Sequence, residues 1–469
     1  MTRQPDCRRL FILPALALLA VALLFILRPA RSPYLDSLRQ GDGHAARAER
    51  TAAVAAYVEA AQVRPRDPAP YLRLTRLYLD WGRPEDAMVA LVEAEQRGGG
   101  EVELERLWVA IHVARGDRPA VVEHARRLLE LAPGDSSARH TLARAYLDLH
   151  EWDAGRAEFE ALLTVDPDDG LAHERLGALL AGADPAGIQH LFAAETDLAE
   201  RLLAALAAPG VADDPAYAGA LLGQALFEEG EWALAARQFE RALLENPDYP
   251  DAHAYLGYAL DRMGLPGEAR PYLLRAVALA PDSAAAHTFL GLHYERLGDL
   301  SAARQEFETA YDLDPANPAT CVEIGQTWAA EGRYVAAEIW LREAVALQPD
   351  DAALWEILAR FYLDHEIDAG RRGTEAAETL VELVPDDARS HDLRGWAAFQ
   401  AGDTDAARES LTQALLLDPA LPSAHYHLGW LWVAQGDRQR AREALTRALD
   451  LDTGGALTPL VERAMIEMP

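Results

Sequence analysis

Lysine is absent from the sequence, and asparagine and cysteine occur only twice each. The two cysteines, Cys7 and Cys321, lie far apart and neither belongs to a Cys-x-x-Cys pair, so a disulfide framework is not expected. Aromatic residues make up only 7% of the chain, and β-branched residues are sparse beside Ala, Leu, Arg and Glu. Because those abundant residues favour helices, the composition predicts an all-α protein.

Positive charge is also scarce. The 469 residues carry a formal net charge of −31, and every basic side chain other than histidine is an arginine. Binding to nucleic acid requires a basic stripe that neutralises phosphates, so this charge balance argues against a nucleic-acid partner. We interpret the excess of acidic residues as a source of solubility.

Catalytic and metal-binding signatures are missing as well. The sequence has no Gly-x-Ser-x-Gly, His-Glu-x-x-His or P-loop motif. Residues 166–170 look like part of a calcium loop, but the closing glutamate is missing. We therefore predict that the chain is not an enzyme, holds no cofactor or metal and takes no small-molecule substrate.

The longest apolar run, residues 10–27, contains eighteen consecutive apolar residues and has arginines on both sides. As a helix it would be roughly 27 Å long, which is about the thickness of a bilayer core. We predict a transmembrane signal anchor there, after a short tail at residues 1–9. The alternative is a cleaved signal peptide, although Arg28-Pro29-Ala30-Arg31 is a poor cleavage site. The positive tail is expected to stay in the cytoplasm, which places the remainder of this single-pass protein outside it.

The rest of the chain repeats at an interval of 34 residues. Pro247, Pro281, Pro315 and Pro349 are spaced by 34, and windows aligned on them, such as 250–283, bring other positions into register. Glycine recurs at window positions 8 and 15, alanine at 20 and 27, leucine at 7 and a large residue at 24. Glycine at position 15 can end a helix in the left-handed conformation, and small residues at 8, 20 and 27 let two antiparallel helices approach closely. One such hairpin cannot bury its apolar face alone, so neighbouring hairpins must stack.

This pattern strongly resembles the tetratricopeptide repeat family, over nearly everything after the apolar run. The resemblance implies a right-handed α-solenoid, or superhelix, of stacked antiparallel helix hairpins preceded by one transmembrane helix, as in membrane-anchored bacterial members of the family. Eight windows match well: 68–101, 136–169, 216–249, 250–283, 284–317, 318–351, 388–421 and 422–455. Two windows are degenerate: 102–135, and 352–387, which is two residues longer.

The register also predicts the domain boundaries. Residues 28–67 form a juxtamembrane segment with a degenerate repeat, whose first helix looks poor. An N-terminal block of repeats follows at 68–181 and a C-terminal block at 216–455. Residues 456–469 are expected to form a capping helix over the last repeat. Its predicted apolar face consists of Leu457, Leu460, Val461, Ala464 and Met468.

Residues 182–215 interrupt the register between the two blocks. Residues 188–208 read as one longer helix, and a Pro-Gly-containing linker follows. This irregular helical insertion is a hinge, a docking element or a lengthened hairpin loop, and the sequence leaves these alternatives open.

Histidine recurs at window position 4. The five histidines are His173, His253, His287, His391 and His425. They resemble a metal ladder, but neighbouring helices pack about 8–10 Å apart, too far for two such side chains to share one zinc ion. We interpret them as replacements for the family's aromatic packing residue at this position.

The family binds partners in a concave groove lined by positions 2, 5, 9, 12 and 13 of each first helix. Carried over by register, the resemblance implies a partner-binding groove with Arg76 and Arg144 near its start and Tyr258, Asp261, Leu292 and Glu295 in its middle. Its last part contains Trp396, Phe399, Tyr426 and Trp430. Because Trp and Tyr often anchor binding surfaces, residues 390–435 predict a hydrophobic peptide site. The alternative is that the superhelix or the capping helix covers these aromatic side chains.

The resemblance implies a membrane-tethered scaffold or adaptor that recruits components of an envelope, secretion or polysaccharide-assembly complex. Its expected partners are proteins or peptide segments, together with the lipid bilayer through residues 10–27, and its expected location is a bacterial inner membrane. The alternative function is an accessory or regulatory subunit of a separate membrane enzyme, such as a glycosyltransferase or a polymer-export machine.

Overall fold

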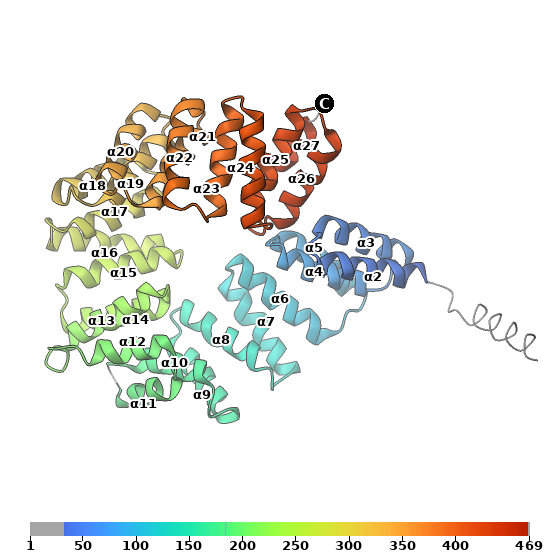
Figure 1. The fold of residues 1–469 in the computed structure, drawn as a ribbon. Coiled ribbons are helices and arrows are strands. Elements are labelled where there is room, and N and C mark those ends of the chain that lie inside the picture. Colours follow the sequence, from blue (N-terminus) through green and yellow to red (C-terminus); the bar gives the residue numbers. More distant parts are fainter. Residues whose placement is uncertain (1–31, 183, 468–469) are drawn as a thin grey trace, which may run out of the picture. The chain divides into compact units, whose positions relative to one another are not determined.

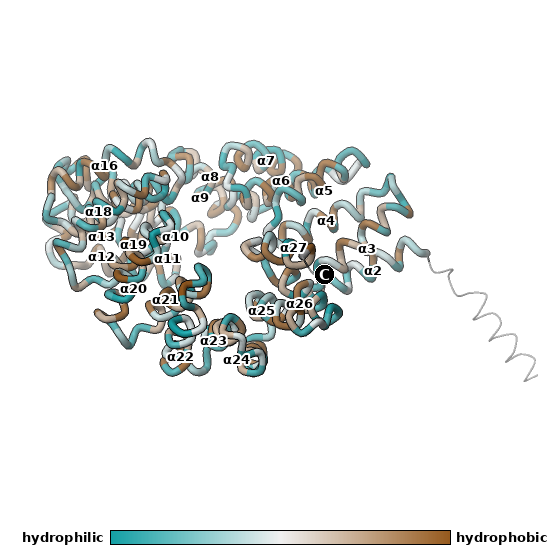
Figure 2. The backbone as a smooth tube through the Cα atoms, turned by 90° about the horizontal axis from the view of Figure 1, so that it is seen from above, coloured by the Kyte–Doolittle hydropathy of each residue, from teal (hydrophilic) through white to brown (hydrophobic). Residues whose placement is uncertain are grey.

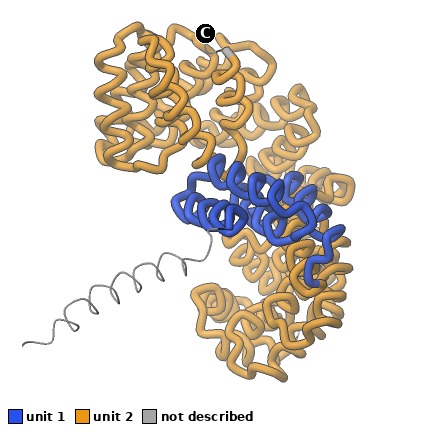
Figure 3. The backbone as a smooth tube through the Cα atoms, turned by 90° about the vertical axis from the view of Figure 1, so that its right-hand side faces the viewer, with its two compact units in different colours: residues 1–100 blue, residues 101–469 orange. Residues whose placement is uncertain are grey.

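The computed structural model describes residues 32–182 and 184–467. Over these residues the chain is helical and contains no strand, which confirms the predicted all-α class (Figure 1). The chain divides into two compact units, Met1–Gly100 and Glu101–Pro469, which Figure 3 colours separately. Figure 2 shows hydrophobic and hydrophilic residues alternating along the helices, as expected when each helix buries one stripe of its surface.

The predicted membrane anchor at residues 10–27 lies outside the described residues. Among the helices that the structure does describe, none has both the length and the apolar character that a bilayer span requires.

The described part of the first unit, residues 32–100, contains two helix hairpins. They are α2 (Pro33–Ala46) with α3 (Arg50–Val63), and α4 (Ala69–Asp80) with α5 (Pro84–Gln96). The expectation of a poor first helix in residues 34–67 was wrong, because α2 is complete and buries Tyr34 and Leu38. Gly41 in α2 faces the ring of Tyr57 in α3 so closely that a Cβ atom would overlap the ring. Gly41 and Tyr57 occupy window positions 8 and 24, so this hairpin follows the same rule as the good repeats.

The second unit continues the series of hairpins. The pairs before the irregular segment are α6 (Glu101–Arg115) with α7 (Arg118–Leu131), and α8 (Ser136–Asp148) with α9 (Trp152–Val165). The pairs after it are α13 (Pro215–Glu228) with α14 (Trp232–Glu245), α15 (Pro250–Arg262) with α16 (Pro266–Leu279), α17 (Ala284–Arg296) with α18 (Leu300–Leu313), α19 (Pro318–Ala330) with α20 (Tyr334–Leu347), α21 (Ala352–Asp364) with α22 (Thr374–Leu383), α23 (Ala388–Gln400) with α24 (Thr404–Leu417), and α25 (Pro422–Ala434) with α26 (Arg438–Leu451). The two extra residues of window 352–387 fall around a short π-helix, η1 (Ala369–Gly373), between α21 and α22.

Most of the described hairpins close around a glycine at window position 8. A Cβ atom on Gly291 would lie 2.5 Å from Phe307 Cε1, and one on Gly257 would lie 2.5 Å from Leu273 Cγ. The same glycine meets the large side chain at position 24 in the hairpins of Gly223, Gly325, Gly395 and Gly429. The alanines at positions 20 and 27 are buried in the same interface. The sequence prediction that small residues allow close helix approach is therefore confirmed.

The glycines at window position 15 end the first helices as predicted. Their φ angles lie between 70° and 85° in Gly82, Gly116, Gly230, Gly264, Gly298, Gly332, Gly402 and Gly436. Left-handed backbone of this kind costs little only for glycine, so these positions fix where each hairpin turns.

The irregular segment contains a shortened hairpin and one extra helix. Residues 188–208 were expected to form one longer helix, but they form two: α11 (Pro185–Ala194) and α12 (Asp197–Leu206). The chain breaks at Glu195, which has a φ of 52°, and Thr196 caps α12 by accepting a hydrogen bond from the Ala199 N–H. Helix α11 pairs with α10 (Gly170–Leu180), so α12 alone is surplus to the hairpin pattern.

Helix α27 (Thr458–Glu467) packs on α26 at the end of the described chain. Val461 and Ala464 are buried against Leu445 and Ala448, as the predicted apolar face requires. Leu460, which was placed on that face, is 46% exposed, and Met465 packs there instead. Met468 lies outside the described residues.

A test of this packing compares two glycines in neighbouring hairpins. Replacing Gly291 by alanine forces its Cβ into Phe307 and should destabilise the array by about 1–3 kcal/mol. Replacing Gly267, which is exposed in α16 and has open space around it, should stabilise the helix by up to about 1 kcal/mol. Urea unfolding followed by circular dichroism measures both shifts. Equal midpoints for the two variants would show that the hairpin does not close at position 8.

Candidate partner-binding groove

Six residues at groove positions line one cavity in the middle of the array. They come from positions 9, 12 and 13 of two successive windows, on α15 and α17. The cavity, here named the middle cavity, measures about 280 Å³ and is lined by Tyr258, Asp261, Arg262, Leu292, Glu295 and Arg296. The structure therefore brings the predicted groove residues Tyr258, Asp261, Leu292 and Glu295 together.

Asp261 is the most constrained residue of the middle cavity. Its side chain is 4% exposed, and its Oδ2 atom lies 2.8 Å from Nδ1 of the fully buried His293. Arg296 donates a hydrogen bond to the Asp261 carbonyl at 2.5 Å. Within the described part of the chain, the buried Oδ1 atom of Asp261 has no donor. Because Oδ1 is buried, Asp261 shapes the wall of the cavity and does not present that oxygen to a partner.

An aromatic cluster surrounds Tyr258. Its ring centroid lies 4.9 Å from that of Phe289, 5.4 Å from Phe227 and 6.2 Å from Trp232. Tyr255 contacts both phenylalanines from the adjoining turn of α15. Sequence reasoning missed this cluster, although Phe227 occupies window position 12, one of the groove positions that the register already named.

A larger cavity of about 610 Å³ forms where α8 meets α14, two helices that belong to separate hairpins. We call it the arginine cavity, after Arg118, Arg144, Arg175 and Arg262 in its lining. Arg262 lines the middle cavity as well, and its guanidinium lies 5.2 Å from the centroid of Trp232, another residue of the arginine cavity. The two cavities therefore meet at Arg262.

Ion pairs hold the arginine cavity together across a long stretch of sequence. Arg175 contacts both carboxylate oxygens of Glu231, at 2.9 Å through Nη2 and 2.8 Å through Nη1. The predicted groove residue Arg144 is 63% exposed and lies 3.9 Å from Glu231. Arg118 donates to Asp148 at 3.1 Å. Further side-chain hydrogen bonds tie α14 to α10, where Gln238 donates to the Ala178 carbonyl and Arg241 to the Ala181 carbonyl.

Three of the four predicted C-terminal aromatic residues lie together, with Phe399 and Tyr426 both close to the ring of Trp396. Trp396 stacks on Phe399 with 5.1 Å between centroids and lies 6.5 Å from Tyr426. His427 stacks on Trp396 at 4.4 Å, and its Nδ1 atom lies 2.7 Å from Asp392. All of these aromatic side chains are half-buried.

The capping helix accounts for part of that burial. Tyr426 and Trp430 pack against the cluster formed by Leu445, Ala448 and Val461, the last of which belongs to α27. The alternative that the cap covers these aromatics therefore applies to both residues. Trp396 and Phe399 pack against other clusters, so they are the better candidates for a partner contact.

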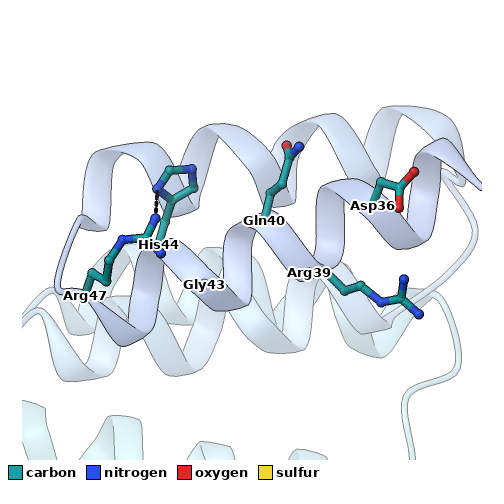
Figure 4. Close-up of a pocket in the computed structure, with 6 residues that line it drawn as sticks. All are labelled: Asp36, Arg39, Gln40, Gly43, His44 and Arg47. Atoms are coloured by element: carbon teal, nitrogen blue, oxygen red, sulfur yellow. Dashed lines mark hydrogen bonds between the residues drawn. The ribbon is translucent and has the colours of Figure 1, made fainter. Parts of the chain in front are cut away.

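The first unit offers weaker candidates. Arg76 is exposed on α4. A hollow of about 400 Å³ runs along α2, and Figure 4 shows its lining residues Asp36, Arg39, Gln40, Gly43, His44 and Arg47. All six come from one helix and the residue that ends it, and none is a large apolar residue. This hollow is the hydrophilic outer side of a helix and has no apolar floor for a partner.

The position-4 histidines are donors that cap the preceding turn. In each case Nε2 lies 2.7–3.2 Å from the carbonyl of the proline six residues earlier, so the ring donates to an oxygen that the preceding helix leaves unpaired. Trp355, at position 4 of window 352–387, makes the same bond to Pro349 at 2.8 Å. The described residues contain no group of three or more metal-binding side chains. The prediction of a structural role holds, and the role includes hydrogen bonding as well as packing.

Sequence comparison places these repeats in a family. One model described as tetratricopeptide repeat matches residues 220–283, 256–318 and 393–456, and a second with the same description matches 112–181 and 296–361. Together they match more than half of the chain. The chain belongs to the tetratricopeptide repeat family. Proteins of this family generally mediate protein–protein interactions, and the repeat fold is typically a non-catalytic scaffold.

Other comparisons give only distant likenesses. No curated protein matches the sequence. The tetratricopeptide chain is similar to the APC/C hetero-tetramer Cut9-Hcn1, with 15% identity and a TM-score of 0.41 over 95% of this chain and 99% of that one. It is similar to yeast Tom70, with 15% identity and a TM-score of 0.40 over 92% and 96%. It is also similar to YrrB, described as a tetratricopeptide protein with an unusual peptide-binding site, with 19% identity and a TM-score of 0.34 over 40% and 96%.

Burial shifts the pKa of two glutamates, Glu295 in the middle cavity and Glu323 in α19. Burial raises the pKa of Glu295, and burial together with the charge of Glu295 raises the pKa of Glu323 in α19 to about 7. A raised pKa in the folded state means that folding favours the protonated form of the side chain over the charged form. The stability due to Glu323 is therefore present in full below its ordinary pKa of 4.5 and is lost as the pH rises through 7.

We therefore expect Glu323→Gln to raise the melting temperature at pH 8 by about 2 °C and to change it little at pH 4.5. Glu308→Gln, at an exposed position on α18, is the matched control and should show no such growth with pH. Thermal melts followed by circular dichroism at several pH values measure the difference. A constant difference between Glu323→Gln and the parent across this range would contradict the raised pKa.

Proposed function

We propose that this tetratricopeptide protein is a membrane-tethered scaffold or adaptor that recruits components of an envelope, secretion or polysaccharide-assembly complex. The anchor is residues 10–27, in a bacterial inner membrane, and the repeats follow a right-handed superhelix outside the cytoplasm. Anchoring would confine the groove near membrane partners and raise their effective concentration.

One observation carries the proposal. Positions 9, 12 and 13 of two successive windows, which the family uses for partner contacts, line a single cavity. An aromatic cluster lies beside that cavity, and aromatic side chains are frequent anchors of protein interfaces. Asp261 and its buried partner His293 fix the wall of that cavity.

The groove can be tested by photo-crosslinking capture from native membranes. Tyr258→Ala combined with Leu292→Ala removes the two large side chains of the middle cavity and should reduce the yield of captured protein at least tenfold. Val165→Ala combined with Leu416→Ala is the matched control, because those side chains are 78% and 71% exposed on second helices. Capture should be unchanged in the control. An unchanged set of captured proteins in the Tyr258 and Leu292 variant, at equal helicity, would exclude the middle cavity as the binding site.

The membrane tether makes a separate prediction. Replacing Leu18 and Leu19 by arginine places two charges in the middle of the apolar run, each at a cost of about 3 kcal/mol in a bilayer core. The parent chain should remain in the membrane fraction after alkaline extraction, whereas the variant should be released. Release of the parent chain under the same conditions would contradict an uncleaved anchor at residues 10–27.

A further inference from the structure

The arginine cavity contains more positive than negative charge, in a chain whose net charge is −31. Four guanidiniums line it, against the carboxylates of Asp148 and Glu231. Asp148 accepts from Arg118, and Glu231 is engaged by Arg175. The remaining two arginines therefore carry charge that the cavity's own acidic residues do not match.

Those two arginines are available to a ligand. Arg144 is 63% exposed, and its nearest carboxylate oxygen is 3.9 Å away, beyond hydrogen-bond length. Arg262 is exposed and lies over the face of Trp232. Within residues 32–182 and 184–467, neither guanidinium donates a side-chain hydrogen bond. Guanidinium groups form their strongest hydrogen bonds with carboxylates, often in pairs.

The cavity also has an apolar floor. Val113, Pro119, Leu149, Trp232, Met263 and Leu265 line it, together with deeper core residues. Val113 is 52% exposed, so part of this apolar surface faces solvent. A volume of about 610 Å³ is large enough for more than one side chain. An occupant with only negative charge would leave this floor uncovered, and an occupant with only apolar groups would leave two guanidiniums unpaired.

We propose that the arginine cavity binds an acidic peptide segment that carries a large apolar side chain between its carboxylates. The carboxylates contact Arg144 and Arg262, and the apolar side chain enters the cavity beside Trp232. Arg262 belongs to both cavities, so the same segment can continue into the middle cavity and contact Tyr258 and Leu292. This inference rests on the proposed function, because it names the chemistry of the partner that the groove receives.

The test uses the full chain in detergent and a short fluorescein-labelled peptide in which one phenylalanine is flanked on both sides by glutamates. Fluorescence polarisation should show saturable binding that weakens as salt is added, because the contacts are partly exposed charges. Arg144→Glu combined with Arg262→Glu should weaken binding at least tenfold. Arg127→Glu combined with Arg408→Glu is the control, because it makes the same change in net charge on the second helices α7 and α24, outside the cavity.

Two altered peptides separate charge from apolar contact. Replacing the glutamates by glutamines, or the phenylalanine by alanine, should each weaken binding at least tenfold. The proposal is overturned if the glutamine peptide binds as tightly as the glutamate peptide, or if the control variant loses as much affinity as the cavity variant. Circular dichroism of both variants checks that the helices are intact.

Failure of this inference can be told apart from failure of the proposed function. If capture from membranes is lost in the Tyr258 and Leu292 variant but the glutamate peptide does not bind, the groove binds a partner of other chemistry and only the acidic-peptide inference is wrong. If the peptide binds as expected but membrane capture does not depend on the groove, the inference stands as a binding property and the recruiting function is wrong.

Discussion

The close approach of two helices at window position 8 is the constraint on which the array depends. A glycine there lets the residue at position 24 of the second helix pack against bare backbone, and the alanines at 20 and 27 are buried beside it. This packing fixes the distance between the two helices of a hairpin and determines which sides of them face outward. In six repeats the ring N–H at position 4 donates to the proline carbonyl of the preceding turn and so joins one hairpin to the next. These two contacts set the register that places positions 9, 12 and 13 along one groove.

The irregular segment accompanies the contact that forms the arginine cavity. Because α11 completes a hairpin with α10, the surplus is a single helix, α12, followed by the linker to α13. Beyond it, α14 lies against α10 of the preceding hairpin and against α8, which belongs to the hairpin before that one. The pair Arg175 and Glu231 joins residues 56 positions apart across this contact. A solenoid in which each hairpin touches only its neighbours would not form the arginine cavity.

Much of this architecture was predictable, because close helix packing requires small residues that recur in the sequence every 34 positions. The glycines at positions 8 and 15 followed from spacing, whereas the groove positions came from the family resemblance. The first helix of residues 34–67 was judged poor because much of α2 is polar, although Gly41 at position 8 faces Tyr57 as in the good repeats. The break at Glu195 was missed because apolar residues continue on both sides, and only the cap at Thr196 marks it. The contact of α8 with α14 leaves no periodic trace, since it joins residues whose separation is unrelated to 34.

The central claim is that α8 meets α14, which brings Arg144 beside Glu231. Spin labels on cysteines introduced at these two positions, with Cys7 replaced by serine and the buried Cys321 retained, measure this directly. The account predicts dipolar broadening of the continuous-wave EPR spectrum in the doubly labelled protein, beyond the sum of the two singly labelled spectra. A doubly labelled spectrum equal to that sum would mean that α8 and α14 do not meet and that the arginine cavity does not exist.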